Sequence, residues 1–254
     1  MISCKLCGGI GNQLFQIAAA HALALRNKDI SGFDLGSCYT PLQGKPSNVY
    51  KESILKNVND IKGYNFNYIY AEPKFSYQEI PHANDLMLDG YYQSEEYFID
   101  YKNEIIELFG SELNNEFIDD YLKNYSLPIT SVHIRRGDYV KNPDYHKPCS
   151  VEYYKEAMEL IGDSTFIFIS DDINWVKENF KGDNIIYSPF KTDVDDLTLM
   201  TKCDNNIIAN SSFSWWGAYL NKNENKKVIA PIEWFGPLGP KDIQNIIPKK
   251  WIKI

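Results

Sequence analysis

The sequence lacks the features that mark secreted, membrane-spanning and duplex-binding proteins. Its five cysteines are an odd, scattered set, which favours a reducing cytoplasm over a disulfide-stapled secreted domain. The N-terminus reaches glycines by position 8 without a long apolar run, so no signal peptide is expected. No stretch approaches the roughly 20 apolar residues that span a bilayer. The formal net charge of −8 argues against a protein that coats nucleic acid, because phosphate backbones require a basic face.

Metal-binding patterns are also weak. Cys4 and Cys7 spell C-x-x-C, but residues three apart in an extended segment point to opposite faces, and no second pair or His cluster lies nearby. Asp193 and Asp195 form a D-x-D, which holds a divalent metal in some sugar transferases. Apolar residues at helical spacing follow them, so these carboxylates are also explained as the first turn of a helix, where the dipole favours them. The sequence therefore predicts no metal site and no cofactor.

Strands that alternate with helices are the main pattern that is present. The first half opens with a strand over residues 2–7, a glycine-rich turn and a helix that reaches residue 27. From residue 131 onward the alternation is regular, which is typical of a parallel sheet covered by helices. Leu127-Pro128 marks the boundary, so the predicted domains are residues 1–127 and 128–254.

The other expected elements follow from periodicity and capping. In the first half they are a strand at 30–35, a helix within 53–61 of an otherwise irregular stretch, a strand at 86–88, and helices at 101–109 and 111–122. In the second half they are helices at 150–161 and 174–180, strands at 165–169, 184–187, 206–209 and 227–230, and helices after Asp193 and Asn210.

An arginine pair follows the strand that begins at Ser131. The alternating run contains His133 and ends at Ile134, and Arg135, Arg136 and Asp138 follow it. In open α/β sheets ligands bind at the carboxyl ends of the strands, and the planar guanidinium suits a phosphate or carboxylate. Ordinary surface ion pairs explain an isolated Arg-Arg-Gly-Asp equally well.

Two more strand ends in the second half carry polar groups. Asp171 follows the strand at 165–169, and a carboxylate there could accept hydrogen bonds from a ribose or a base. Asn210, Ser211, Ser212 and Ser214 lie where the next helix begins, and serine hydroxyls with backbone N–H groups at a helix start form an anion site. With the arginine pair, these ends predict a nucleotide-linked ligand.

The first half offers two segments that suit a ligand. Gly9 and Gly11 belong to the turn before the first helix, where backbone can approach a ligand closely, although the turn lacks the third glycine of a dinucleotide fingerprint. Tyr91, Gln93 and Glu95 follow the strand at 86–88 and offer the aromatic face and hydrogen-bonding groups that a sugar requires. A plain connection and a half-buried aromatic loop are the alternative interpretations.

Four motifs together resemble glycosyltransferase family 11, the α-1,2-fucosyltransferases. They are Gly-Gly-Ile-Gly-Asn-Gln-Leu-Phe-Gln at 8–16, Gly-Tyr-Tyr-Gln-Ser at 90–94, His-Ile-Arg-Arg-Gly-Asp-Tyr at 133–139 and Asn-Ser-Ser-Phe-Ser-Trp-Trp-Gly at 210–217. The resemblance spans nearly the whole chain. It implies an α/β, GT-B-like enzyme of two Rossmann-like halves with a cleft between them, the first half on the acceptor side and the second binding GDP-fucose.

The resemblance also implies an activity and residue roles. The reaction is metal-independent transfer of fucose from GDP-fucose, a co-substrate, to the 2-hydroxyl of a terminal galactose, with inversion. Arg135, Asn12 and His133 are the expected catalytic residues, with Arg135 on the diphosphate. The expected donor-binding residues are Gly9, Gly11, Arg136, Asp138, Asp171, Asn210, Ser211, Ser212 and Ser214, and the expected acceptor-binding residues are Tyr91, Gln93 and Glu95.

The expected partners are GDP-fucose and a galactose-terminated oligosaccharide or lipid-linked glycan, but no nucleic acid. We expect a cytoplasmic protein without an integral membrane segment, with a peripheral position at the inner face of the membrane as an option. A fucosyltransferase of another linkage, a GDP-sugar hydrolase and a GDP- or glycan-binding module without chemistry are the alternatives.

No residue is identified as the base that accepts the acceptor's proton. Asp34, Glu95, His21 and Asp138 are candidates, and a phosphate oxygen that takes the proton late is another.

Overall fold

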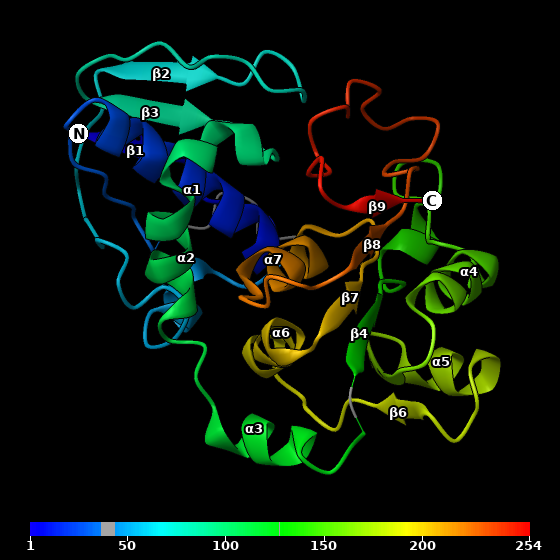
Figure 1. Cartoon of the computed structure of the whole chain (residues 1–254). Helices are drawn as coiled ribbons and strands as arrows, with labels where there is room; N and C mark the ends of the chain where they lie inside the picture. Colours follow the sequence, from blue (N-terminus) through cyan, green and yellow to red (C-terminus); the bar gives the residue numbers. More distant parts are fainter. Residues whose placement is uncertain (37–43, 127) are drawn as a thin grey trace. The chain divides into compact units, whose positions relative to one another are not determined.

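The computed structural model describes residues 1–36, 44–126 and 128–254, and the chain forms two compact units (Figure 1). Unit 1 comprises Met1–Leu113 and Asp242–Pro248, and unit 2 comprises Asn114–Lys241 and Lys249–Ile254. Cys38 and Leu127 lie outside the described residues. The four described cysteines are free thiols.

The units divide the chain before the predicted boundary at 127/128 and again near its end. Helix α3 (Glu116–Leu122) belongs to unit 2 because Ile118 is fully buried with Ile129 and Leu199, and because Asp119 pairs with Lys202 at 2.6 Å. The segment Asp242–Pro248 belongs to unit 1. Its Asp242 accepts a hydrogen bond from the Ser76 backbone N–H at 3.1 Å, a long-range contact that local sequence patterns do not contain.

Unit 1 is built on a parallel sheet in the order β1-β3-β2. Its strands are β1 (Ile2–Cys4), β2 (Tyr68–Ala71) and β3 (Leu86–Asp89), and both β1 and β2 pair in parallel with β3. The expected strand at 30–35 is only two isolated bridges, from Ser31 to Ile2 of β1 and from Phe33 to Asp60. Because all these pairings are parallel, the carboxyl ends of the strands share one edge of the sheet.

Helices cover this sheet. Helix α1 (Ile10–Arg26) packs on β1 with Leu14, Phe15 and Ile17 fully buried, as the helical spacing predicts (Figure 1). Helix α2 (Lys102–Gly110) follows three short 3₁₀ helices along the chain, at Ser47–Tyr50, Glu95–Tyr97 and Ile99–Tyr101.

Two helix predictions in the first half are corrected. Residues 53–61 form turns with short-range hydrogen bonds, such as Lys56 N–H to Ser53 O at 2.9 Å, instead of a helix. The helix expected at 111–122 begins only after Asn115, whose side chain accepts from the Phe117 N–H as an N-cap.

Unit 2 contains a six-stranded parallel sheet in the order β6-β5-β4-β7-β8-β9. Its strands are β4 (Ile129–Ile134), β5 (Thr165–Ser170), β6 (Ile185–Tyr187), β7 (Asn205–Ile207), β8 (Val228–Ala230) and β9 (Ile252–Lys253). Its helices, besides α3, are the 3₁₀ helix Tyr139–Lys141, α4 (Val151–Ile161), α5 (Ile173–Asn179), α6 (Asp193–Lys202) and α7 (Ser212–Leu220). β9 and the 3₁₀ helix Tyr139–Lys141 were not predicted, and the start of α3 is corrected above; the other elements confirm the predictions to within a few residues.

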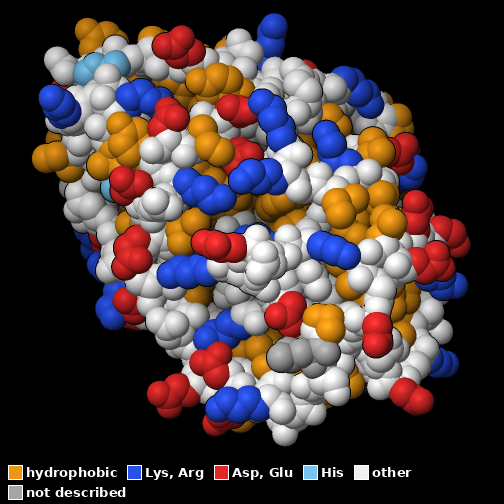
Figure 2. Space-filling view, in the orientation of Figure 1, with side chains coloured by type: hydrophobic (Ala, Val, Ile, Leu, Met, Phe, Trp, Pro, Cys, Tyr) orange, Lys and Arg blue, Asp and Glu red, His pale blue; other side chains and the backbone are white. Residues whose placement is uncertain are grey.

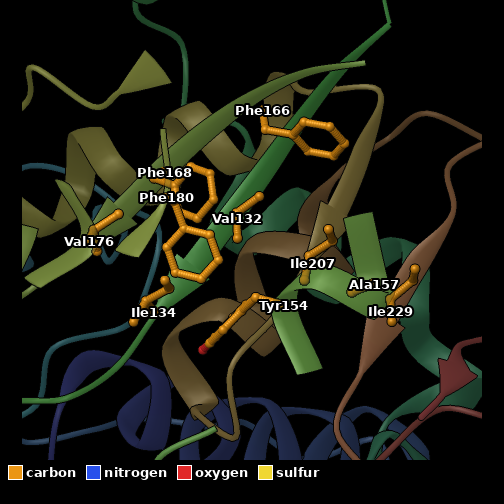
Figure 3. Packing of buried hydrophobic residues seen from close by; sticks show 10 residues of the cluster. All are labelled: Val132, Ile134, Tyr154, Ala157, Phe166, Phe168, Val176, Phe180, Ile207 and Ile229. Atoms are coloured by element: carbon orange, nitrogen blue, oxygen red, sulfur yellow. The ribbon is translucent and has the colours of Figure 1, made fainter. Parts of the chain in front are cut away.

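Helices cover both faces of the second sheet, because its interior strand β5 is apolar on both sides. Along β5, Phe166 and Phe168 point into one core cluster, whereas Ile167 and Ile169 point into another. The first cluster, drawn in Figure 3, also contains Tyr154 of α4 and Val176 of α5, and the second lies against α3 and α6. The alternation of β5 therefore fixes which helices lie on which face.

The described residues include no helix with the length and apolarity needed to cross a bilayer. On the face shown in Figure 2, acidic and basic side chains are interspersed and no broad single-sign field appears.

Candidate functional site

Arg135 lies at the carboxyl end of β4, where two carboxylates hold it. Its guanidinium contacts Asp138 Oδ1 through Nη2 at 2.6 Å and Asp171 Oδ2 through Nη1 at 3.0 Å. The side chain remains 37% exposed. Because each terminal nitrogen carries a second N–H, a fixed and partly exposed guanidinium still has donors for an anionic ligand.

Arg136 is more enclosed and has different partners. Its Nε lies 3.1 Å from Asp172 Oδ2, and its guanidinium carbon lies 3.9 Å from the centre of the Trp175 ring. Its backbone N–H donates to Asp171 Oδ1 at 2.9 Å. These contacts make Arg136 an anchor between the end of β4 and the start of α5.

Asp171 links both arginines, and Gly137 leaves room for it. A Cβ at Gly137 would lie 2.6 Å from Asp171 Oδ2. The two guanidiniums meet three carboxylates, those of Asp138, Asp171 and Asp172, so this strand end is not a net positive patch. An anion would therefore bind through directed N–H groups and not through a surplus of charge.

His133 lies behind the arginines and is 5% exposed. Its ring centre is 5.4 Å from that of Phe213, and its Nδ1 has no hydrogen-bond partner among the described residues. Burial, and then the charge of Arg135, lowers the pKa of His133 to about 3. The imidazole is therefore neutral near pH 7 and adds no positive charge beside Arg135.

The start of α7 separates the predicted serine and asparagine ligands into two groups. Asn210 Nδ2 donates to the carbonyls of Lys147 and Trp234, each at 2.8 Å, and Ser214 is fully buried with its hydroxyl 3.4 Å from the Ser211 carbonyl. Ser211 is the N-cap residue but its side chain makes no capping hydrogen bond. Ser211 and the half-buried Ser212 thus hold the positions nearest to the positive end of the helix.

In unit 1, the glycine turn and the tyrosine loop meet. Gln93 Nε2 donates to Asn12 Oδ1 at 2.8 Å, and Gln16 Nε2 donates to the Gly90 carbonyl at 3.0 Å. Gly8 has φ +76° and a Cβ there would lie 2.4 Å from Asn12 Nδ2. Asn12, Gln93 and the turn are therefore one connected group at the end of β1 and β3.

The other predicted residues of unit 1 surround this group. Gly9 is the N-cap of α1, in extended conformation, and no atom of residues 1–36, 44–126 or 128–254 other than its own chain neighbours lies within 4 Å of its Cβ position, whereas Gly11 is buried inside the helix. Tyr91 and Glu95 are half-buried on the loop after β3. The roles of all these residues as ligands stay predictions.

Glu72 joins the unit 1 group although the sequence patterns did not single it out. It follows β2 directly and accepts hydrogen bonds from the backbone N–H groups of Tyr91 at 2.7 Å and Tyr92 at 3.0 Å. Burial raises the pKa of Glu72 to about 7, although the two N–H groups favour the carboxylate. The missed signal was the short Tyr-Ile-Tyr-Ala strand before it, because a polar residue after a strand is the same pattern that identified Arg135.

The base candidates named from the sequence have other partners. Asp138 is bound to Arg135, Asp34 Oδ1 accepts the Gly36 N–H at 3.0 Å, and His21 Nδ1 lies 2.7 Å from Ser31 Oγ. Burial lowers the pKa of His21.

The D-x-D acids lie in the first turn of α6, as its helical spacing predicts. Asp195 N–H donates to the Thr192 N-cap oxygen at 3.1 Å, and Asp196 accepts from Ser188 Oγ at 2.8 Å. Across residues 1–36, 44–126 and 128–254, no group of three or more His, Cys, Asp or Glu side chains is arranged to hold a metal ion. Independence from metal stays a prediction.

Relatives of known name match this chain along most of its length. The E. coli "O-antigen biosynthesis glycosyltransferase WbnK" is 33% identical over 92% of this chain and 95% of that protein. An E. coli "Alpha-1,2-colitosyltransferase" is 29% identical over 100% of this chain and 99% of its own. The rabbit (Oryctolagus cuniculus) "Galactoside alpha-(1,2)-fucosyltransferase 2" is 26% identical over 84% of this chain and 65% of that protein.

A solved structure resembles the fold. The fucosyltransferase NodZ from Bradyrhizobium superposes with a TM-score of 0.53 at 16% identity, over 85% of this chain and 90% of that one. At this identity the likeness concerns the fold alone. It agrees with the parallel sheets of both units, and the predicted α/β, GT-B-like class is confirmed.

The model of "Glycosyl transferase family 11" matches residues 1–254. The four motifs, the parallel sheets whose strand ends carry them and this whole-chain match agree, and the chain belongs to glycosyl transferase family 11.

Proposed function

We propose that this protein transfers fucose from GDP-fucose to the 2-hydroxyl of a terminal galactose, with inversion at the fucose anomeric carbon and without a metal ion. The position of Arg135 carries the proposal. A partly exposed guanidinium that Asp138 and Asp171 hold at a strand end is a preorganised donor for a diphosphate. The names of several relatives, which specify α-1,2 linkage, support the linkage.

The chemistry requires such a donor. As the bond between fucose and phosphate breaks, negative charge develops on GDP and positive charge on the sugar. Fixed N–H groups on the β-phosphate stabilise that charge without reorganising during the reaction. Arg135 and the start of α7, with Ser211 and Ser212, would supply them in unit 2. In unit 1, Tyr91 and Gln93 would contact the acceptor.

An assay with GDP-fucose, with and without lactose or another β-galactosyl acceptor, tests the proposal. Acceptor-dependent release of GDP and an α-1,2 linkage in the product, measured by nuclear magnetic resonance, are expected. Release without acceptor would favour a hydrolase, and no release with measurable GDP binding would favour a binding module. A product with another linkage would contradict the regiochemistry but not the transfer.

A second donor has a specific observation in its favour. A relative that matches 100% of this chain is a colitosyltransferase, so an activated colitose is the competing donor. Running both donors at equal concentration with the same acceptor panel decides between them through the ratio of kcat/KM. A ratio that favours colitose would replace fucose in the proposal and leave the acceptor chemistry unchanged.

A further inference from the structure

Glu72 lies among the segments of unit 1 that carry the predicted ligand-binding residues. Because β1, β2 and β3 are parallel, the glycine turn after β1, Glu72 after β2 and Gly90 after β3 share one edge of the sheet. The Gln93–Asn12 hydrogen bond of 2.8 Å joins the loop after β3 to the start of α1, which follows the glycine turn. Glu72, after β2, is joined to the same loop because it accepts the Tyr91 backbone N–H.

The surroundings of Glu72 are adapted to a carboxylate. Its two oxygens bind consecutive backbone N–H groups, those of Tyr91 and Tyr92, at 2.7 and 3.0 Å. A Cβ at Gly90 would lie 2.3 Å from Glu72 Cβ, so this approach depends on glycine. In the part of the chain that the structure describes, no Lys, Arg or His forms an ion pair with Glu72. Each oxygen keeps lone pairs for a proton.

Two of the other candidates named as bases, Asp138 and His21, are less suitable. Asp138 Oδ1 lies 2.6 Å from Arg135 Nη2, so this carboxylate already holds the guanidinium in place. His21 lies eleven residues into α1 from Ile10, and this places it about 16 Å along the helix from the glycine turn. It also contacts Ser31, which pairs with Ile2 at the opposite end of β1.

We infer that Glu72 is the catalytic base of the transfer, an inference that rests on the proposed function. The acceptor hydroxyl oxygen forms its bond to the fucose anomeric carbon while the bond from that carbon to the β-phosphate oxygen breaks. That electron pair leaves with GDP, and the hydroxyl proton passes to a Glu72 carboxylate oxygen. The backbone N–H groups of Tyr91 and Tyr92 fix the carboxylate for this step.

The charge state of Glu72 makes the transfer depend on pH. The charge of Asp242 raises the pKa of Glu72 further. The charge of Glu72 in turn raises the pKa of Cys4, Tyr92 and Tyr97. Because its pKa is about 7 and only the ionised form accepts a proton, kcat falls as the pH drops below about 7.

The experiment compares the full-length wild type with Glu72→Gln, Glu72→Ala and the matched control Glu79→Gln, an exposed glutamate of the same unit. Transfer to lactose is measured from pH 5.5 to 9, with GDP affinity by calorimetry and thermal unfolding as checks of folding. Glu72→Gln should lower kcat by about 10²- to 10⁴-fold and leave GDP affinity within about twofold. Sodium formate should restore part of the activity of Glu72→Ala, because a small carboxylate can occupy the vacated space.

Each other outcome contradicts the inference. If Glu72→Gln keeps more than about a tenth of wild-type kcat, Glu72 has a purely structural role. The same follows if the variant loses activity but its remaining kcat still falls below about pH 7 as in the wild type. Loss of activity that accompanies loss of GDP binding or of folding, without formate rescue of Glu72→Ala, does the same. A wild type that transfers no sugar from either donor refutes the proposed function and this inference with it, whereas an active wild type with an active Glu72→Gln refutes the inference alone.

Discussion

Arg135 and Arg136 are adjacent in the sequence but hold different positions at the end of β4. Arg135 is 37% exposed between two carboxylates, whereas Arg136 is 20% exposed and stacked on Trp175. A ligand can therefore reach Arg135 more easily, and Arg136 contributes mainly to the local structure.

Arg135→Ala is expected to lower kcat by about 10²- to 10³-fold, the usual cost of removing one donor to a developing oxyanion. Arg136→Ala should reduce kcat less and instead destabilise unit 2 by about 0.5–1 kcal/mol, through the lost stacking on Trp175. Steady-state kinetics and urea unfolding check both. Arg135→Lys is the charge-preserving control and should remain impaired, because an ammonium lacks the two-sided fork that binds Asp138 and Asp171. If Arg135→Ala retains most activity, Arg135 is not the arginine that stabilises the leaving diphosphate.

His133 makes the stability of unit 2 depend on pH. Its pKa is about 3 in the folded protein and near 6.5 when unfolded, so the unfolded state takes up the proton first as the pH falls. Stability is retained above pH 6.5 and lost progressively below it. At pH 5 the loss attributable to His133 is about 2 kcal/mol.

His133→Phe should remove most of this acid sensitivity, since Nδ1 has no partner to lose and a ring still packs on Phe213. Tryptophan fluorescence reports on unit 2 alone, because all five tryptophans lie within it. Urea unfolding gives the free energy of unfolding at pH 7 and at pH 5 for the wild type and for His133→Phe, with exposed His82→Gln as the control. An unchanged acid effect in His133→Phe would assign the sensitivity to another group.

At the scale of elements, the two glycines of the turn before α1, Gly8 and Gly9, have different explanations. Position 8 requires glycine for its own geometry, because its φ is +76° and a Cβ would lie 2.4 Å from Asn12 Nδ2. Gly9 has no such need, since its Cβ position is open. A ligand that approaches the backbone would explain why Gly9 lacks a side chain.

Gly8→Ala is therefore expected to destabilise unit 1 by about 1–2 kcal/mol and to disturb Asn12. Gly9→Ala should lower the free energy of unfolding by less, about 0.5–1 kcal/mol, the difference between Gly and Ala at an N-cap, and should also lower kcat/KM. Circular dichroism with urea and steady-state kinetics separate the two effects. If Gly9→Ala leaves kcat/KM unchanged, no substrate approaches this position.

The sequence predicted best those elements that have a clear hydrophobic period or a capping residue next to them in the sequence. Helix α4 begins after Ser150, whose hydroxyl accepts the Tyr153 N–H as expected from its sequence position. β2 was missed although its residues favour strands, because it is short, and its Tyr68 and Ile69 are exposed at a sheet edge. The turns at 53–61 combine apolar spacing with local hydrogen bonds that do not propagate as a helix.

The candidate site was predictable where a polar group directly follows a recognisable strand. Arg135, Asp171 and Ser211 were found in this way. Glu72 was not, because its role depends on Gly90 and on the N–H groups of Tyr91 and Tyr92, which pairing between strands distant in the sequence brings to it. Likewise, the internal hydrogen bonds of Asn210 are visible only in three dimensions.

At the scale of the whole molecule, nucleotide binding can be followed in unit 2. The predicted donor residues after β4, β5 and β7 belong to this unit, as do all five tryptophans. A ligand that binds only the folded state stabilises it by about 2.7 kcal/mol at a hundred times its Kd. GDP should therefore raise the midpoint of the fluorescence-monitored unfolding transition.

Because Arg135 and the start of α7 would supply the donors to the diphosphate, this GDP-induced shift should be the same in EDTA as in magnesium. Arg135→Ala should reduce the shift, whereas Lys181→Ala, at an exposed position of the same unit, should preserve it. Thermal unfolding followed by tryptophan fluorescence, with and without GDP, measures the shift for the wild type in EDTA, the wild type in magnesium, Arg135→Ala and Lys181→Ala. A shift that disappears in EDTA and returns with magnesium would show that a metal ion, and not the arginine alone, holds the diphosphate. An equal shift in wild type and Arg135→Ala would place the nucleotide away from the end of β4.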